Sequence, residues 1–267
     1  MQLGDSESIM RPVERRDRIV FLVSNHGRVS VEFLADQLST SRETVRRDLS
    51  ALAEAGRIRK FHGGATAITG ESEPAVEAHF HARMGESIAE KRLIATRAAA
   101  LFKDHDVLFI DSGSTTVFFA EALVSHRSLT VITNSILIAQ TVARGDASNT
   151  VFLLGGQYHE DLVENLGPMV VSQIAQFHAR HLVLTIGSAN AAGIFDFNIH
   201  EAEIARAMIE RAEMVTVLAD VSKFERSGIF KVCDLSRIDR IVLDKAPDPS
   251  LAFALNSAGV EVIVANS

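Results

Sequence analysis

Hydroxyl-bearing residues and glycines follow several apolar runs in the second half of the chain, and a lysine lies in the last of these segments. The segments are Asp111-Ser112-Gly113-Ser114-Thr115-Thr116, Thr133-Asn134-Ser135, Gly155-Gly156 and Asp220-Val221-Ser222-Lys223. Hydroxyl groups, backbone N–H groups and the start of a helix together favour an anion such as a phosphate. Each segment alone could be a simple helix cap, but four that each follow a strand predict a site for a phosphate-bearing polar ligand.

The elements that must position these segments alternate along the chain. Apolar runs predict strands over 107–110, 129–132, 151–154, 182–186, 215–219, 241–243 and 260–264, with helices between them over 94–101, 116–123, 135–142, 170–177, 201–212 and 251–258. This alternation is typical of an α/β domain with a mostly parallel sheet covered by helices on both faces. Ligands bind beyond the carboxyl ends of the strands in such sheets, which is where the four segments fall.

The charge of the chain is divided unevenly between its two parts. The 267 residues carry a net charge of −7, which for the whole chain argues against nucleic acid. Residues 1–62 nevertheless hold 11 Lys and Arg against 9 Asp and Glu, a net of +2, so the remainder has a net of −9. A basic head on an acidic body is typical of a two-domain DNA-binding protein. From charge alone, a solvated helix face explains the head equally well.

Helical patterns in the first 66 residues predict a DNA-binding domain. Apolar spacing and capping serines predict helices over 13–24, 31–38 and 42–55. The last two are joined by a three-residue polar break, which is the helix-turn-helix arrangement, here about 29–48, whose second helix enters the major groove. Residues 57–64 end in a glycine turn and predict a β-wing. A helical hairpin that binds no nucleic acid is the alternative.

Polar and basic residues of the third helix and the wing are the candidate DNA contacts. Arginine can bind guanine edges or phosphates, and hydroxyls near a helix start can donate to phosphate. The predicted contacts are Ser41, Arg42, Thr44, Arg46, Arg47, Arg59, Lys60 and His62.

Other features exclude further classes of site. Residues 67–85 are polar, contain Pro74 and show no apolar period, so they predict a connector to a second domain over 86–267. The pair His79 and His81 with Glu77 is too sparse for a metal site, and Cys233 is the one cysteine, so we expect no metal, disulfide or cofactor. The chain shows no secretory signal and no apolar run of about 20 residues, which predicts a cytoplasmic protein that does not span a membrane.

The chain resembles the DeoR family of bacterial transcriptional regulators. The resemblance lies in Ser41-Arg42-Glu43-Thr44-Val45-Arg46-Arg47-Asp48-Leu49 and Phe61-His62-Gly63-Gly64-Ala65, and then in DSGSTT, TNS, LLGG, the Gly167 turn, the helix at 201–206 and ADVSKF. It implies a winged helix-turn-helix followed by a sensor domain similar in fold to ribose-5-phosphate isomerase. It also implies a repressor of a carbohydrate or polyol operon that binds double-stranded operator DNA as a homodimer or homotetramer and is relieved by a phosphorylated effector.

A sugar-phosphate isomerase fused to a DNA-binding head is the rival interpretation. Aldose–ketose isomerisation needs a carboxylate base beside the substrate. The isomerase carries an acid-rich segment after a central strand, whereas this chain has Ile186-Gly187-Ser188-Ala189-Asn190 there, without an acid. We therefore predict binding without turnover and no catalytic residues.

A second loop distinguishes branches of the family. Where the family commonly has a Gly-Leu-Thr-Thr-like loop, this chain has Gly193-Ile194-Phe195-Asp196-Phe197-Asn198-Ile199-His200-Glu201, which resembles the glycerol-3-phosphate repressor branch. Asp196, His200 and Glu201 are predicted to bind polyol hydroxyls while a phenylalanine closes an apolar wall. The alternative is that the phenylalanines are core and that His200 and Glu201 only open a helix.

Overall fold

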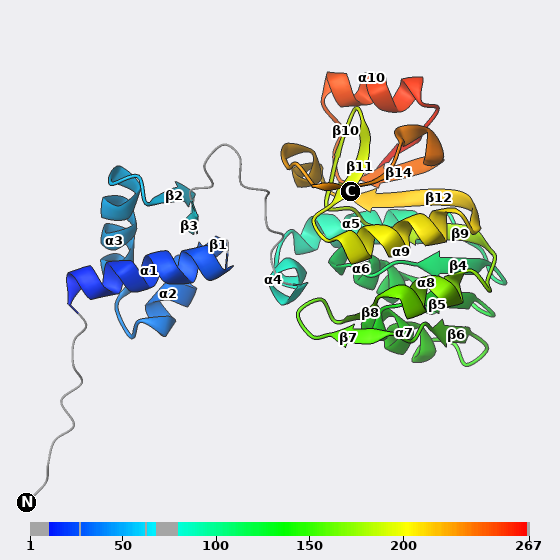
Figure 1. The fold of residues 1–267 in the computed structure, drawn as a ribbon, viewed down its shortest axis with the longest axis horizontal. Helices are drawn as coiled ribbons and strands as arrows, with labels where there is room; N and C mark the ends of the chain where they lie inside the picture. Colours follow the sequence, from blue (N-terminus) through cyan, green and yellow to red (C-terminus); the bar gives the residue numbers. More distant parts are fainter. Residues whose placement is uncertain (1–10, 27, 62, 68–79, 266–267) are drawn as a thin grey trace, which may run out of the picture. The chain divides into compact units, whose positions relative to one another are not determined.

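The computed structural model describes residues 11–26, 28–61, 63–67 and 80–265 and divides into two units, with the boundary after residue 78. Each unit has a hydrophobic core of its own. Figure 1 shows the helices and strands of both units.

The first unit is a winged helix-turn-helix. Its elements are α1 (Pro12–His26), β1 (Arg28–Ser30), α2 (Val31–Gln37), α3 (Arg42–Glu54), β2 (Ile58–Phe61) and β3 (Gly64–Ala67). The strands form an antiparallel sheet in the order β1-β3-β2, so the predicted wing is present and gains a third strand, β1. A Cβ on Gly64 would lie 2.0 Å from the carbonyl oxygen of Val29, which is why a glycine stands where β3 meets β1.

The second unit is built on a seven-stranded parallel sheet, which confirms the predicted α/β class. The strand order is β15-β14-β12-β9-β4-β5-β6. The strands are β4 (Val107–Ile110), β5 (Thr130–Thr133), β6 (Thr150–Leu153), β9 (Ala179–Leu184), β12 (Ala212–Ala219), β14 (Arg240–Leu243) and β15 (Glu261–Val264). The chain adds β5 and β6 on one side of β4 and then returns to add β9 on the other. This change of direction between β4 and β9 is where such sheets bind ligands.

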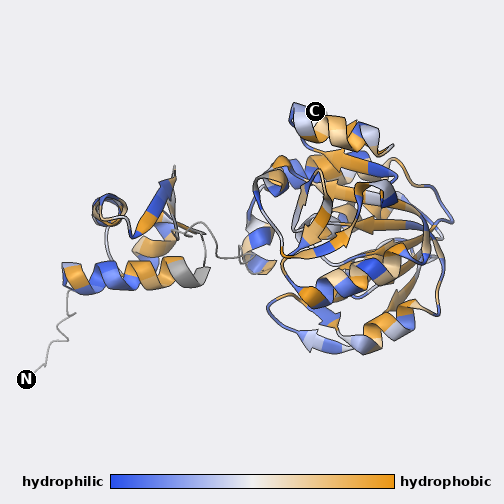
Figure 2. Cartoon of the chain, turned by 45° about the horizontal axis from the view of Figure 1, so that its top comes forward, coloured by the Kyte–Doolittle hydropathy of each residue, from blue (hydrophilic) through white to orange (hydrophobic). Residues whose placement is uncertain are grey.

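Helices cover both faces of this sheet. Buried residues of α5 (Ile88–Ala99), α6 (Ser114–Ala122) and α7 (Ile136–Ala143) form one core with alternate strand residues such as Leu108. Buried residues of α8 (Pro168–Ile174), α9 (Ile199–Ile209) and α10 (Pro249–Ser257) form the other with residues such as Phe109. The strands are consequently apolar along most of their length, as Figure 2 shows.

Smaller elements lie around the sheet, and the sequence pattern did not predict them. They are α4 (Phe80–Gly85), η1 (Leu123–Ser125), β7 (Gln157–His159) with β8 (Glu164–Leu166), the antiparallel sheet of β10 (Ser188–Asn190), β11 (Gly193–Asp196) and β13 (Phe230–Cys233), η2 (Val221–Glu225) and η3 (Leu235–Arg237). These short segments do not carry the apolar runs that mark the strands of the main sheet, so no pattern predicted them. The predicted connector over 67–85 therefore ends earlier, because Phe80 of α4 is buried in the core of the second unit. In the described part of the chain, no helix is long and apolar enough to cross a membrane.

Candidate DNA-binding and effector sites

Helix α3 presents its arginines on the face opposite the core of the first unit. Val45, Leu49 and Leu52 are buried, whereas the side chains of Arg46 and Arg47 are 62% and 79% exposed. Both guanidinium groups lie near the Glu43 carboxylate, at 4.0 and 3.4 Å, and such exposed ion pairs contribute little to stability. The arginines are therefore available to exchange this partner for a phosphate or a guanine edge.

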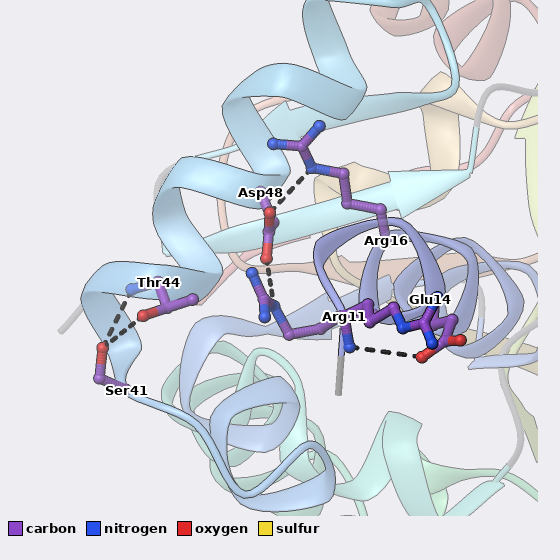
Figure 3. A network of polar contacts seen from close by, with 7 residues as sticks. Arg11, Glu14, Arg16, Ser41, Thr44 and Asp48 are labelled. Atoms are coloured by element: carbon purple, nitrogen blue, oxygen red, sulfur yellow. Dashed lines mark hydrogen bonds and ion pairs between the residues drawn. The ribbon is translucent and has the colours of Figure 1, made fainter. Parts of the chain in front are cut away.

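The other predicted DNA contacts surround this face. Ser41 caps α3, since its hydroxyl accepts a hydrogen bond from the Thr44 N–H at 3.1 Å, and the two hydroxyls are 2.8 Å apart (Figure 3). Arg42 is exposed and 3.8 Å from Glu32. From the wing, Lys60 donates to the Ser50 hydroxyl of α3 at 2.8 Å, so β2 borders the arginine face.

Two wing residues complete the predicted set. Arg59 is exposed on β2, next to Lys60. His62 lies outside the residues that the structure describes, so its predicted contact stays a prediction.

Asp48 holds α3 in place, a role that the sequence pattern did not reveal. Its side chain is 3% exposed and accepts from Arg15 at 2.6 Å and from Arg16 at 2.9 Å, both on α1 (Figure 3). The carboxylate follows the two exposed arginines directly in sequence but faces the opposite way, as the helical period requires. It fixes the orientation in which α3 offers its arginines.

We expect Asp48→Ala to destabilise the first unit by about 3 kcal/mol, because it leaves the partly buried Arg15 without its carboxylate. Chemical denaturation of the full chain, followed through the transition of this unit, measures the change. Asp36→Ala, which removes an exposed carboxylate from α2, is the matched control. Equal stability of the two variants would contradict the role of Asp48.

In the second unit, the loop after β4 lies at the change of direction in the sheet. The N–H of Asp111 donates to the carbonyl oxygen of Val183 on β9 at 2.9 Å. A Cβ on Gly113 would lie 2.0 Å from the methyl carbon of Thr185, so the loop passes directly against the end of β9 and requires a glycine. The predicted segment 111–116 thus stands where α/β sheets bind ligands.

Helix caps account for some of the predicted site residues but not for this loop. Ser135 caps α7 and Asp220 caps η2 with their side chains. Helix α6 starts after Gly113 without a side-chain cap among the described residues, although Ser112, Ser114 and Thr115 around it are buried. The α6 N-terminus therefore keeps backbone donors that suit an anion.

Two hydroxyls of the predicted set are used internally. Thr116 donates to the carbonyl oxygen of Gly113 at 3.0 Å, and the hydroxyl of Thr133 accepts from the N–H of Ser135 at 3.1 Å. Both side chains are fully buried. They shape the loops after β4 and β5.

Buried acids gather beside the loop, and one of them, Glu164 on β8, was not predicted. Asn134 donates its amide N–H to the Glu164 carboxylate at 2.8 Å, while the amide oxygen of Asn134 has no hydrogen-bond partner within the described residues. Burial and the Asp111 charge raise the pKa of Glu164 to about 8, against hydrogen bonds from Ser112 and Asn134. Burial and the charges of Glu201 and Asp196 raise the pKa of Asp111 well above its usual range.

Cations lie in the same region. Lys223 of η2 and Lys91 of α5 are 7% and 3% exposed. Burial and the Lys223 charge lower the pKa of Lys91 to about 8, while the charge of Asp220 raises it. Lys91 donates to the backbone carbonyl of Arg83 on α4, and the Arg83 charge lowers the pKa of Glu164. The structure thus brings Lys223 and Asp220 together with two cations that the sequence pattern did not predict, Lys91 and Arg83.

The remaining predicted residues have other surroundings. Gly155 is bound on both its N–H and its carbonyl oxygen by the Gln173 amide, and a Cβ on Gly156 would strike Leu166. His200 is exposed, with its ring nitrogen 3.3 Å from Glu203 on the same helix.

The loop with Phe195 and Phe197 was predicted either to close an apolar wall over a ligand or to belong to the core. Asp196 accepts from the N–H groups of Phe197 and Asn198, and Phe197 lies against Gly187, while Phe195 and Phe197 are both partly exposed rather than core.

The sequence contains one feature from which the buried role of Lys91 could have been predicted. Lys91, Ile94, Ala95 and Ala98 share one helical face, and a charged residue on an apolar stripe is unusual enough to suggest a buried role. Glu164 and Arg83 had no such signal, since they lie in short elements without a period.

The raised pKa of Glu164 predicts a pH dependence of stability. Between pH 4.5 and about pH 8, the folded protein holds a proton on Glu164 that the unfolded chain has lost. The free energy of unfolding therefore falls as pH rises through this window. Glu164→Gln removes this titration, and we expect the variant to lose less stability than the unmodified protein over that window. Thermal unfolding in a pH series measures it, with the exposed Glu121→Gln as control. Parallel pH profiles for all three proteins would contradict the assignment.

Comparison with known families agrees with both halves of the structure. Residues 15–71 match the DeoR-like helix-turn-helix domain, and residues 86–245 match the DeoR C-terminal sensor domain. Among solved structures, ribose 5-phosphate isomerase A from Neisseria gonorrhoeae is similar over 50% of this chain and 52% of that one, with 18% identity and a TM-score of 0.36.

Several curated proteins match over almost the full length. The glycerol-3-phosphate regulon repressor of Escherichia coli is 31% identical over 95% of this chain and 99% of its own length. The transcriptional repressor AccR of Agrobacterium fabrum is 31% identical over 95% and 97%, and the transcriptional repressor CsqR of Escherichia coli is 29% identical over 94% of each. These relatives are repressors, not enzymes, which agrees with the binding role predicted above. The chain therefore belongs to the DeoR family and is a DNA-binding transcriptional regulator.

Proposed function

We propose that the protein represses a carbohydrate or polyol catabolic operon and leaves its operator when a phosphorylated metabolite binds the sensor domain. Two observations carry this proposal. The N-terminus of α6 has no side-chain cap among the described residues. Two buried lysines, Lys223 of η2 and Lys91 of α5, are close enough for the charge of one to lower the pKa of the other. Directed backbone donors with buried ammonium groups suit a phosphate, and a phosphate would offset the mutual repulsion of the two lysines.

The proposed effector is glycerol 3-phosphate. Acidic side chains near the loop, Asp111, Asp196 and Glu201, can accept hydrogen bonds from polyol hydroxyls, and a protonated Glu164 can donate one. The aromatic loop from Phe195 to Phe197 is the feature that favours this branch. Overall identity does not choose the effector, because the glycerol-3-phosphate repressor and AccR are equally similar to this chain.

Titration of the protein–operator complex tests the effector. We expect glycerol 3-phosphate to release the full chain from a fragment of its own promoter at lower concentration than ribose 5-phosphate or glucose 6-phosphate does. Fluorescence anisotropy of the labelled fragment measures release, and unphosphorylated glycerol is the control. Release by a pentose or hexose phosphate at far lower concentration would reject glycerol 3-phosphate while supporting the phosphate site. Release by none of the phosphorylated compounds would overturn the proposal.

We further propose that the protein works as a homodimer or homotetramer on double-stranded operator DNA in the cytoplasm. One helix-turn-helix reads a single half-site, so a palindromic operator needs two copies. Light scattering of the protein with and without the operator measures the state, and one monomer per operator would contradict it.

A further inference from the structure

Helix α4, the first helix of the sensor unit, carries Arg83, whose charge acts on the buried groups Glu164 and Lys91. Arg83 is 7% exposed, and its backbone carbonyl accepts the Lys91 ammonium. Its charge acts on two buried groups, lowering the pKa of Glu164 and that of Lys91. An arginine in the first helix of the unit is thus an electrostatic neighbour of Glu164 and Lys91.

The position of α4 depends on this region. A helix of six residues is far below the roughly 12–15 residues needed for stability in isolation, so tertiary contacts must hold it. Phe80 is buried, its N–H donates to the Asp161 carbonyl at 3.2 Å, and the Arg83 guanidinium lies 5.7 Å from its ring centroid. Asp161 stands three residues before Glu164, so the first residue of α4 is hydrogen-bonded to the loop that leads into β8.

In sequence, α4 is the first element after residues 68–79, which follow β3 of the DNA-binding unit. A change at α4 is therefore a change at the end of the segment that joins the two units.

We infer that Arg83 is an effector-binding residue and that an anion bound beside the α6 N-terminus shifts α4 by drawing the Arg83 guanidinium from its present neighbours. This inference rests on the proposed phosphate site. A phosphate is a stronger partner for a guanidinium than a carboxyl group that holds a proton, because it accepts paired, charge-assisted hydrogen bonds. Occupancy of the site would thereby reach the segment that leads to the DNA-binding unit.

Hydrogen–deuterium exchange of the unmodified full chain tests this without a substitution. The probes are glycerol 3-phosphate and, separately, inorganic phosphate. We expect either probe to slow exchange in peptides covering 111–116 and to change exchange in peptides covering 80–87. A change at 111–116 with none at 80–87 overturns the inference and leaves the phosphate site standing. No change at 111–116 with either probe overturns the proposed site and the inference with it.

Variants of Arg83 give a second, functional test. We expect Arg83→Gln to need roughly tenfold or more glycerol 3-phosphate for half-release from the operator, with release normalised to the DNA affinity of each variant. Arg83→Lys keeps the charge but not the paired donors, so the concentration it needs for half-release should lie between those of Arg83→Gln and the unmodified protein. Arg92→Gln, which removes an exposed arginine from α5, should match the unmodified protein. Equal release by Arg83→Gln, Arg83→Lys and Arg92→Gln would overturn the inference.

Discussion

Replacing Arg46 and Arg47 together with alanine is expected to weaken operator binding about a hundredfold or more. Each arginine lost from a base edge removes roughly 1–3 kcal/mol, and each lost from a phosphate also lowers the salt dependence of binding by about one unit of slope. Both guanidinium groups are exposed, and within the described part of the chain their ion pairs are with the exposed Glu43, so their removal should leave the fold intact. Fluorescence anisotropy at several salt concentrations measures affinity and slope together.

The control for this variant must remove the same charge elsewhere. Arg92 and Arg97 are exposed on α5 of the sensor unit, and their double replacement with alanine leaves α3 untouched. We expect that protein to bind the operator as the unmodified one does. An unchanged mobility shift for the α3 variant, with its circular dichroism also unchanged, would remove α3 from the DNA-binding surface.

The Lys223→Ala variant is expected to lose most of its response to a phosphorylated effector. Lys223 is buried and supplies a compact charge, and breaking a buried, charge-assisted contact of this kind costs about 3 kcal/mol, or roughly a hundredfold in affinity. Operator binding should persist, because the winged helix-turn-helix is a separate unit with its own core. Calorimetric titration with glycerol 3-phosphate measures effector affinity, and anisotropy measures DNA affinity.

A matched lysine separates a local from a general charge effect. Lys245 is exposed in the same unit, so Lys245→Ala removes one positive charge without removing a buried cation. We expect it to bind effector like the unmodified protein. If Lys223→Ala and Lys245→Ala bind the effector equally well, then Lys223 does not contact the phosphate.

The loss of the Lys223 charge has a further expected consequence for Lys91. The Lys223 ammonium is one of the groups that lower the pKa of Lys91, so Lys223→Ala should raise the pKa of Lys91 toward its ordinary value. This follows from like-charge repulsion between the two buried ammonium groups.

Elements whose residues carry an apolar period or an unbroken apolar run were predictable from the sequence. The helix over 42–55 was visible from Val45, Leu49 and Leu52, and the strand at 107–110 from an unbroken apolar run; both appear in the structure, as α3 and β4. The hydroxyl-rich loop after β4 was also visible, since parallel strands place the loops that follow them at one edge whatever the details of packing.

Short elements and buried charges were decided by tertiary contacts. Helix α4 has six residues and no period, and Phe80 becomes core only when the sheet with its covering helices exists to pack against. Asp48 adjoins exposed arginines in sequence, and only the approach of α1 with Arg15 makes it a buried anchor.

The sequence by itself determined the two-unit order, the helix-turn-helix with its arginine face, and the loops at the carboxyl ends of the strands. These follow from local periodicity and from residue types that act at fixed spacing. Only the tertiary structure decided that Glu164, Lys91 and Arg83 share a region with Asp111 and Lys223. The physical reason is that a buried charge is tolerated where partners from distant elements meet it, and no local pattern records which partners those are.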